Sequence, residues 1–295
     1  MNANEQQKPV VVAVGADQPT VVQYAAGEAL RRGTHLVVLH VYGSASQDLK
    51  DVSAISALPQ EDADAKAVLD QARRVIDGIV EAPPTLYAAE LGMVIQTIKD
   101  HAATAQLLVV GADEISWFER VLGGATARHL AEHAACPVIV VPPIYDLAQL
   151  YGGVCAAVDA DAHAAGPIRF AFEEASARQS TLLVLHVVPE GVDHAELEAD
   201  RVGVAEVLAG WRQEFPDVVV TTRVVVDDEV ASAAAHASEQ SELLVVGRPR
   251  RQFLSGHAAA PRLTREAHCP LAVVDGAYGT DRASGSVDPA QHVEA

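Results

Sequence analysis

Cysteine is scarce in this chain: there are three among 295 residues, and no two of them form a Cys-x-x-Cys pair. This count favours neither a disulfide framework nor a thiolate metal centre, and it is typical of a protein that stays in the reducing cytoplasm. Positive charge is also scarce, because 21 lysine and arginine residues face 40 acidic ones and leave a formal charge of −19. A field of this sign repels nucleic acid and anionic membrane surfaces, so we expect neither as a partner.

Long hydrophobic runs are missing as well. No window approaches the length of about 18 apolar residues that a membrane span needs. Lys8 is the one basic residue before the short apolar run near the start, whereas an export signal begins with a positively charged segment. The sequence therefore predicts neither a membrane span nor an export signal. It also lacks a Gly-x-Ser-x-Gly elbow, a Gly-x-x-x-x-Gly-Lys-Ser/Thr loop, a His-Glu-x-x-His helix and a Gly-x-Gly-x-x-Gly turn after a strand. Without these motifs we do not expect an enzyme.

What is present is an internal repeat, because three stretches recur in the same order in both halves of the chain. They are VAVGAD and AAVDAD, LVVLHV and LLVLHV, and HAACPVIVV and EAHCPLAVV. The repeat predicts two domains of one design, over residues 8–144 and 151–275. The remaining residues 276–295 are mostly small and polar, so we expect a disordered tail there.

Each copy alternates short apolar runs with amphipathic segments. The runs are apolar at nearly every position, which suits strands of a parallel sheet that is covered on both faces. The expected strands are 10–14, 36–41, 85–89, 107–110 and 138–141, and then 154–158, 182–188, 218–226, 243–246 and 271–274. Apolar residues recur at helical spacing between Val68 and Ile79, whereas residues 43–64 are interpreted as a solvated excursion. This order predicts an α/β fold of two tandem, doubly wound parallel sheets.

On these stretches the chain resembles the universal stress protein family in its tandem, two-domain form. The resemblance rests on the LHV strand ends, the LLVVG strand before a glycine loop, the CPVIVV final strand and the segment AEVLAGWRQEFPDVVVTTRVVV. It covers residues 8–144 and 151–275. The resemblance implies an adenine nucleotide alpha hydrolase-like fold with five strands per domain, and pairing of the domains through their last strands. In one branch of the family it also implies binding of ATP.

The first glycine loop departs from the ATP-binding branch. That branch carries Gly-x-x-Gly and, further on, Gly-Ser or Gly-Thr, because glycines let backbone amides approach phosphate at a helix N-terminus. The first copy keeps Gly111 and Gly124, which are candidates for nucleotide contact, but Glu114 replaces the second glycine and Ala125 replaces the hydroxyl residue. Because Asp113 adds another carboxylate, we expect this loop to repel phosphate.

The second copy keeps a different part of the pattern. Asp159 stands at the end of its first strand, where the ATP-binding branch has the Asp that contacts adenosine, whereas the first copy has Gly15 there. The resemblance also implies that Val187 lines the base. The glycine loop of this copy is shorter and carries arginines, which attract phosphate as charged donors. The residues that we expect to border the phosphates are Gly247, Arg248, Arg250, Gly256 and His257.

Simpler interpretations of these residues stay open. The loop glycines can serve only a strand-to-helix turn, Asp159 can serve as an Asx turn or a helix cap, and the loop arginines can form a solvated face. His40 and His186 take equal positions at the end of the second strand, where a packed, hydrogen-bonded histidine is the simpler interpretation. Cys136 and Cys269 precede prolines at the last strand and are interpreted as small buried hydrophobes.

Together these features predict a cytoplasmic stress-response protein that acts as a regulatory or interaction module. ATP binding is expected mainly at the second domain, and a protein partner or self-association as a dimer is expected as well. An alternative keeps the fold without the ligand, as a nucleotide-independent structural protein that binds partners through its loops. A slow nucleotide hydrolase is a third hypothesis, but no general base is evident near either loop.

Overall fold

The computed structural model describes residues 7–43, 52–112, 126–143, 145–148, 152–158, 165–188, 191, 193–226, 230–248 and 259–279. The first copy holds β1 (Val10–Ala13), α1 (Pro19–Arg31), β2 (Leu36–Tyr42), α2 (Val52–Asp77), β3 (Thr85–Leu91), α3 (Val94–Thr104), β4 (Leu107–Gly111), α5 (Thr126–His133) and β5 (Val138–Val141). The second holds β6 (Val154–Ala157), α6 (Ala165–Arg178), β7 (Leu182–Val188), α7 (His194–Glu214), β8 (Val220–Val226), α8 (Val230–Ser238), β9 (Leu243–Gly247), α9 (Ala259–Glu266) and β10 (Leu271–Val274). The ten predicted strands are confirmed, with ends that shift by at most two residues.

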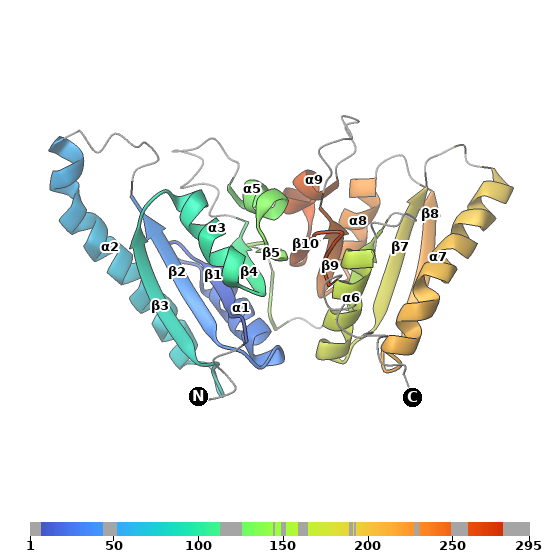
Figure 1. The fold of residues 1–295 in the computed structure, drawn as a ribbon, viewed down its shortest axis with the longest axis horizontal. Coiled ribbons are helices and arrows are strands. Elements are labelled where there is room, and N and C mark those ends of the chain that lie inside the picture. The colour runs from blue at the N-terminus through green and yellow to red at the C-terminus, as the bar shows by residue number, and fades with distance from the viewer. Residues whose placement is uncertain are drawn as a thin grey trace, which may run out of the picture.

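The strands form one ten-stranded sheet in the order β3-β2-β1-β4-β5-β10-β9-β6-β7-β8. Within each copy all neighbouring strands are parallel, as the strand-helix alternation predicts. The two halves join where β5 and β10 pair antiparallel, with Ile139 opposite Ala272. Pairing of the domains through their last strands is therefore confirmed. In Figure 1 these two strands lie in the middle of the molecule, and α2 and α7 lie at its outer ends.

Helices cover both faces of the sheet, and β1 shows how the sequence arranges this. Val10 and Val12 point into a core shared with α1 and α2, where Ala25 is fully buried. The alternate residue Val11 points to the opposite face and packs in a second core, which contains Ile98 of α3. Because both faces are dry, every residue of the strand is apolar, and burial of each valine stabilises the fold by about 1.5–3 kcal/mol.

The start of α2 corrects one sequence-based expectation. Residues 43–64 were expected to form a solvated excursion, but α2 begins at Val52, so much of this stretch is helical. Alanine is the commonest residue in 54–67, and its high helix propensity outweighs one proline, Pro59. The apolar residues at helical spacing in the second half of α2 pack on the sheet as predicted.

The described residues continue past β10 to residue 279. Residues 276–279 form a turn in which the ring of Tyr278 packs edge-on against Phe170, at 5.5 Å between centroids. The Tyr278 hydroxyl also donates a hydrogen bond of 2.8 Å to Glu173. The predicted tail from 276 therefore starts with residues that contact α6, and the rest of it lies outside the described residues. Among the helices of the described ranges, none is long and apolar enough to cross a membrane.

Candidate functional site

The carboxyl ends of β1 and β4 in the first copy, and of β6 and β9 in the second, form the natural ligand crevices of this sheet. In each copy these two strands are neighbours in the sheet. The chain leaves one of them towards one side of the sheet and the other towards the opposite side. Such a switch point leaves a crevice outside the strand ends, where ligands of doubly wound sheets bind. Gly15 follows β1, and Gly111 and Gly247 are the last residues of β4 and β9.

In the first copy this crevice is filled by a side chain of the protein itself. The Gln18 Oε1 accepts a hydrogen bond of 3.3 Å from the backbone N–H of Gly15. The Gln18 Nε2 lies so close to Gly111 that a Cβ at that glycine would stand 2.3 Å away from it. Gly111 is buried along with the rest of β4. Gly111 was predicted to lie near a nucleotide, and in this structure it contacts Gln18.

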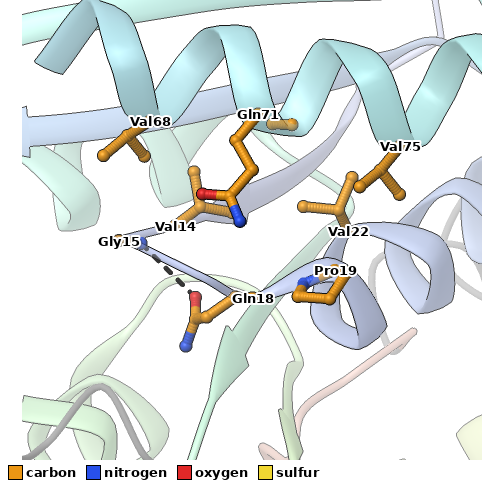
Figure 2. A pocket seen from close by; sticks show the side chains of 9 residues that line it. Val14, Gly15, Gln18, Pro19, Val22, Val68, Gln71 and Val75 are labelled. Carbon is orange, nitrogen blue, oxygen red and sulfur yellow. Dashed lines mark hydrogen bonds between the residues drawn. The ribbon is translucent and has the colours of Figure 1, made fainter.

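A hollow beside this glutamine lies between α1 and α2 and is shown in Figure 2. It has an empty volume of about 200 Å³, which includes space open to solvent. Ligand pockets for drug-sized molecules are typically ~300–1,000 Å³, so this hollow is too small to hold a nucleotide. Its lining is mostly apolar and comprises Val14, Gly15, Gln18, Pro19, Val22, Val68, Gln71, Ala72 and Val75.

The second copy differs at the equivalent glycine. Gly247 is exposed, whereas the other residues of β9 are buried. Among the described residues, a Cβ at Gly247 would meet Pro167 Cγ at 3.5 Å, an ordinary van der Waals distance. Val187, which was predicted to line the base, is half-buried near the end of β7 and packs against the core. The strand end of the second copy is thus the more accessible one.

Several predicted site residues cannot be placed. Gly124 and the two carboxylates of the first loop lie outside the described residues, as do Asp159, Arg250, Gly256 and His257. Their predicted roles stay predictions. In the part of the chain that the structure describes, no three His, Cys, Asp or Glu side chains gather to hold a metal ion.

Arg248 has partners other than a phosphate. Its Nε donates to the carbonyl of Ala131 at 3.1 Å, and its Nη2 donates to the carbonyl of Cys136 at 3.2 Å. Its Nη1 pairs with Asp275 at 3.2 Å. Ala131 lies in the last turns of α5, whose free carbonyls attract cations. Arg248 therefore links the start of the second glycine loop to a helix of the first copy, and its predicted phosphate contact would have to compete with these bonds.

The two strand-end histidines are packed and hydrogen-bonded, which confirms the simpler interpretation. His40 Nδ1 lies 2.7 Å from the carbonyl of Val14, and His186 Nδ1 lies 3.1 Å from the carbonyl of Val158. A carbonyl can only accept, so Nδ1 carries the proton in both rings. Burial also lowers the pKa of His40 below its usual value. Each histidine fixes the end of the neighbouring strand, which is the strand that leads into the crevice.

The cysteines behave as buried apolar residues. All three are free thiols and are buried. Burial raises the pKa of Cys136 and of Cys155 to about 12, and it raises that of Cys269 as well. Because the thiolate is the reactive form, these groups are inert at neutral pH. The interpretation of Cys136 and Cys269 as small buried hydrophobes is confirmed.

Sequence reasoning missed a buried charge cluster between the domains. Glu28 lies near the end of α1 and Arg32 is its C-cap residue, and Glu174 and Arg178 take the equivalent positions at the end of α6. Arg32 donates to Glu174, Arg178 donates to Glu28, and Arg178 also contacts Glu174 of its own helix at 3.0 Å. We call these four residues the interdomain quartet. Glutamate four residues before arginine at the same place in both copies was the available signal, but this spacing usually marks a solvated helix face.

Arginines set the ionisation of the quartet. Burial alone would raise the pKa of Glu28, but Arg178, Arg31 and Arg32 bring it down to about 2. Burial and the neighbouring Glu28 charge raise the pKa of Glu174 instead. Around these charges, Arg178 lies 5.9 Å from the ring centre of Tyr24, and Arg32 lies 5.5 Å from that of Phe170 at the equivalent position. The domain interface is therefore a matched pair of surfaces related by an approximate two-fold axis.

These observations define a tandem α/β protein in which two doubly wound units share one sheet and each presents a switch-point crevice. The family model for universal stress proteins matches residues 7–142 and again residues 151–275. The chain belongs to the universal stress protein family. A universal stress protein of Mycobacterium tuberculosis strain H37Rv is 28% identical over 278 residues, which cover 87% of this chain and 91% of that protein.

Other known proteins agree with this assignment. A universal stress protein of Mycolicibacterium smegmatis is 29% identical over 289 residues, covering 90% of this chain and 95% of that one. The crystal structure of a universal stress protein from Archaeoglobus fulgidus superposes with a TM-score of 0.63 at 16% identity, covering 91% of this chain and 97% of that chain. At this identity the likeness shows the fold alone. It supports the tandem architecture that the sequence predicted.

Proposed function

We propose that this universal stress protein is a cytoplasmic regulatory or interaction module that binds one adenine nucleotide, ATP, at its second domain. The observation that carries the proposal is the contrast between two equivalent glycines. Gly111 is buried under a side chain of its own domain, whereas Gly247 is exposed at the mouth of its crevice. Backbone at an exposed glycine can be approached closely by a phosphate, which a buried one does not permit.

The chemistry of the second copy fits an adenine nucleotide. Asp159 follows the strand end that His186 holds, and the resemblance to the ATP-binding branch implies that its carboxylate accepts hydrogen bonds from adenosine. Arg250 supplies the positive charge that a triphosphate needs in a chain with a net charge of −19. Gly247, Gly256 and His257 are expected to border the phosphates. Arg248 is held by α5 and Asp275 and is expected to contribute less.

Calorimetric titration with ATP tests this proposal. The intact chain should release heat on binding, and Asp159→Ala should weaken binding by about 10- to 100-fold, because hydrogen bonds to a charged group contribute about 1.5–3 kcal/mol. The matched control is Asp100→Ala, which removes the same charge from an exposed position on α3. A loss of affinity in both variants would reject the role of Asp159, because net charge alone would then explain it.

The alternative, a structural protein that binds partners without a nucleotide, makes the opposite prediction. It expects no heat and no thermal shift of the intact chain at millimolar ATP. Its support is the first copy, where the crevice holds a side chain. We further propose that the protein does not hydrolyse ATP, because its sequence lacks the motifs of the common hydrolase classes. Phosphate release above the buffer background would contradict this part of the proposal.

A further inference from the structure

Gln18 breaks a local rule at the start of α1. It occupies the N-cap of this helix, yet its side chain makes no capping hydrogen bond. Serine, threonine, aspartate and asparagine are preferred at this position, because their short side chains satisfy the free N–H groups of the first turn. A residue that gives up a capping bond is expected to have another role. Here the side chain turns away from the helix and towards the strand ends.

The turn that carries Gln18 is held in place from α2. Asp17 has a φ of 62°, a left-handed conformation that costs energy for most residues but is tolerated by aspartate. Its N–H donates to Gln71 Oε1 at 3.2 Å, and its Oδ1 accepts from Gln71 Nε2 at 3.0 Å. This reciprocal pair fixes the turn between β1 and α1. Figure 2 shows the result, with the carboxamide of Gln18 directed at Gly15 and Gln71 reaching down from α2.

The position of the Gln18 carboxamide corresponds to that of a ligand. Its oxygen takes the backbone donor at Gly15, directly after β1. Its nitrogen end fills the space above Gly111, at the end of β4. These strand ends are the two walls of a switch-point crevice, and a ligand would use the same donor and the same space.

We propose that Gln18 is an internal ligand of the first copy, and that it restricts nucleotide binding to the second copy. The second half of this inference rests on the proposed function. The sequence supports it, because VGADQ of the first copy aligns with VDADA of the second, so that Ala162, a residue outside the described ranges, takes the aligned position of Gln18. Alanine has no carboxamide, and the glycine of the second copy, Gly247, is exposed.

The first experiment tests the internal ligand without any nucleotide. Gly111→Ala places a methyl group where Gln18 Nε2 now lies and should expel the carboxamide. In urea unfolding we expect this change to lower the ratio of folded to unfolded protein by roughly two- to tenfold, the loss typical of one hydrogen bond. In a Gln18→Ala background the same change should cost clearly less, since the added methyl group then meets Val21 Cγ2 at 3.1 Å but no longer the carboxamide. Equal losses in both backgrounds would overturn the proposal, because the two residues would not be coupled.

The second experiment tests whether a glutamine at this position prevents nucleotide binding, by introducing one at the aligned position of the second copy. Ala162→Gln should weaken ATP binding in calorimetry at least tenfold, while Gln18→Ala should leave the affinity of the second copy unchanged. Unchanged affinity in Ala162→Gln would overturn the restriction. If the intact chain itself binds no ATP, the proposed function and the restriction fail together. The unfolding experiment with Gly111→Ala still decides whether Gln18 is an internal ligand.

Discussion

The interdomain quartet predicts a large loss of stability when one of its arginines is removed. Arg178 is 5% exposed, and it contacts Glu28, Glu174 and the Tyr24 hydroxyl, the last at 3.0 Å. Arg178→Ala leaves two buried carboxylates with fewer cations to balance them. Breaking a buried pair in this way costs about 3–5 kcal/mol, which is a large share of the ~5–15 kcal/mol that stabilises a typical domain.

Urea unfolding followed by circular dichroism measures this loss, because urea does not screen the charges as guanidinium chloride does. The matched control is Arg201→Ala, which removes an arginine from a pair with Glu198 that is half exposed and should cost about 0–1 kcal/mol. Replacing both Glu28 and Arg178 by methionine should recover much of the loss, since no unbalanced charge is then buried. A loss below ~1 kcal/mol in Arg178→Ala would refute the reasoning, because water would then have to reach the quartet.

Two further predictions concern pH and close packing. The pKa of Glu28 falls from 4.5 to about 2, so its contribution to stability is full above pH 4.5 and is lost as the pH falls towards 2. In thermal melting, the stability of Glu28→Gln should therefore change less with pH in this window than that of the wild type. The raised pKa of Glu174 has the opposite effect on the wild type, because protonation of Glu174 favours the folded state. Gly166→Ala should destabilise strongly in urea, because its Cβ would lie 2.1 Å from the backbone oxygen of Asp275. Gly203→Ala, which has free space in α7, should be neutral or stabilising by up to ~1 kcal/mol.

The strands could be predicted from the sequence because two dry faces leave a simple signal. A strand such as Leu107–Gly111 is apolar at every position, and no helix of five residues would be stable alone. The start of α2 was missed because residues 43–64 mix polar and apolar positions without a clear period. Propensity alone decides such a stretch, and it is a weak guide before tertiary contacts are known.

The site was less predictable because its contacts cross between segments that are distant in the sequence. Arg248 stands in a run of basic residues that is typical of a phosphate loop, and only the folded chain shows that α5 provides its partners. The direction of the Gln18 side chain follows from one turn and from Gln71, which lies 53 positions later. The interdomain quartet needs the pairing of β5 with β10, since that pairing brings α1 and α6 together.

The seam between β5 and β10 also bears on how the two copies can diverge. Because one chain supplies both strands, dilution cannot separate the halves, and each keeps its neighbour at a fixed, high local concentration. Mutations that spoil ligand binding in one half are then tolerated, as long as that half still presents its share of the seam and of the buried charges. Tethering of this kind would let one half serve as a scaffold while the other carries the proposed nucleotide site.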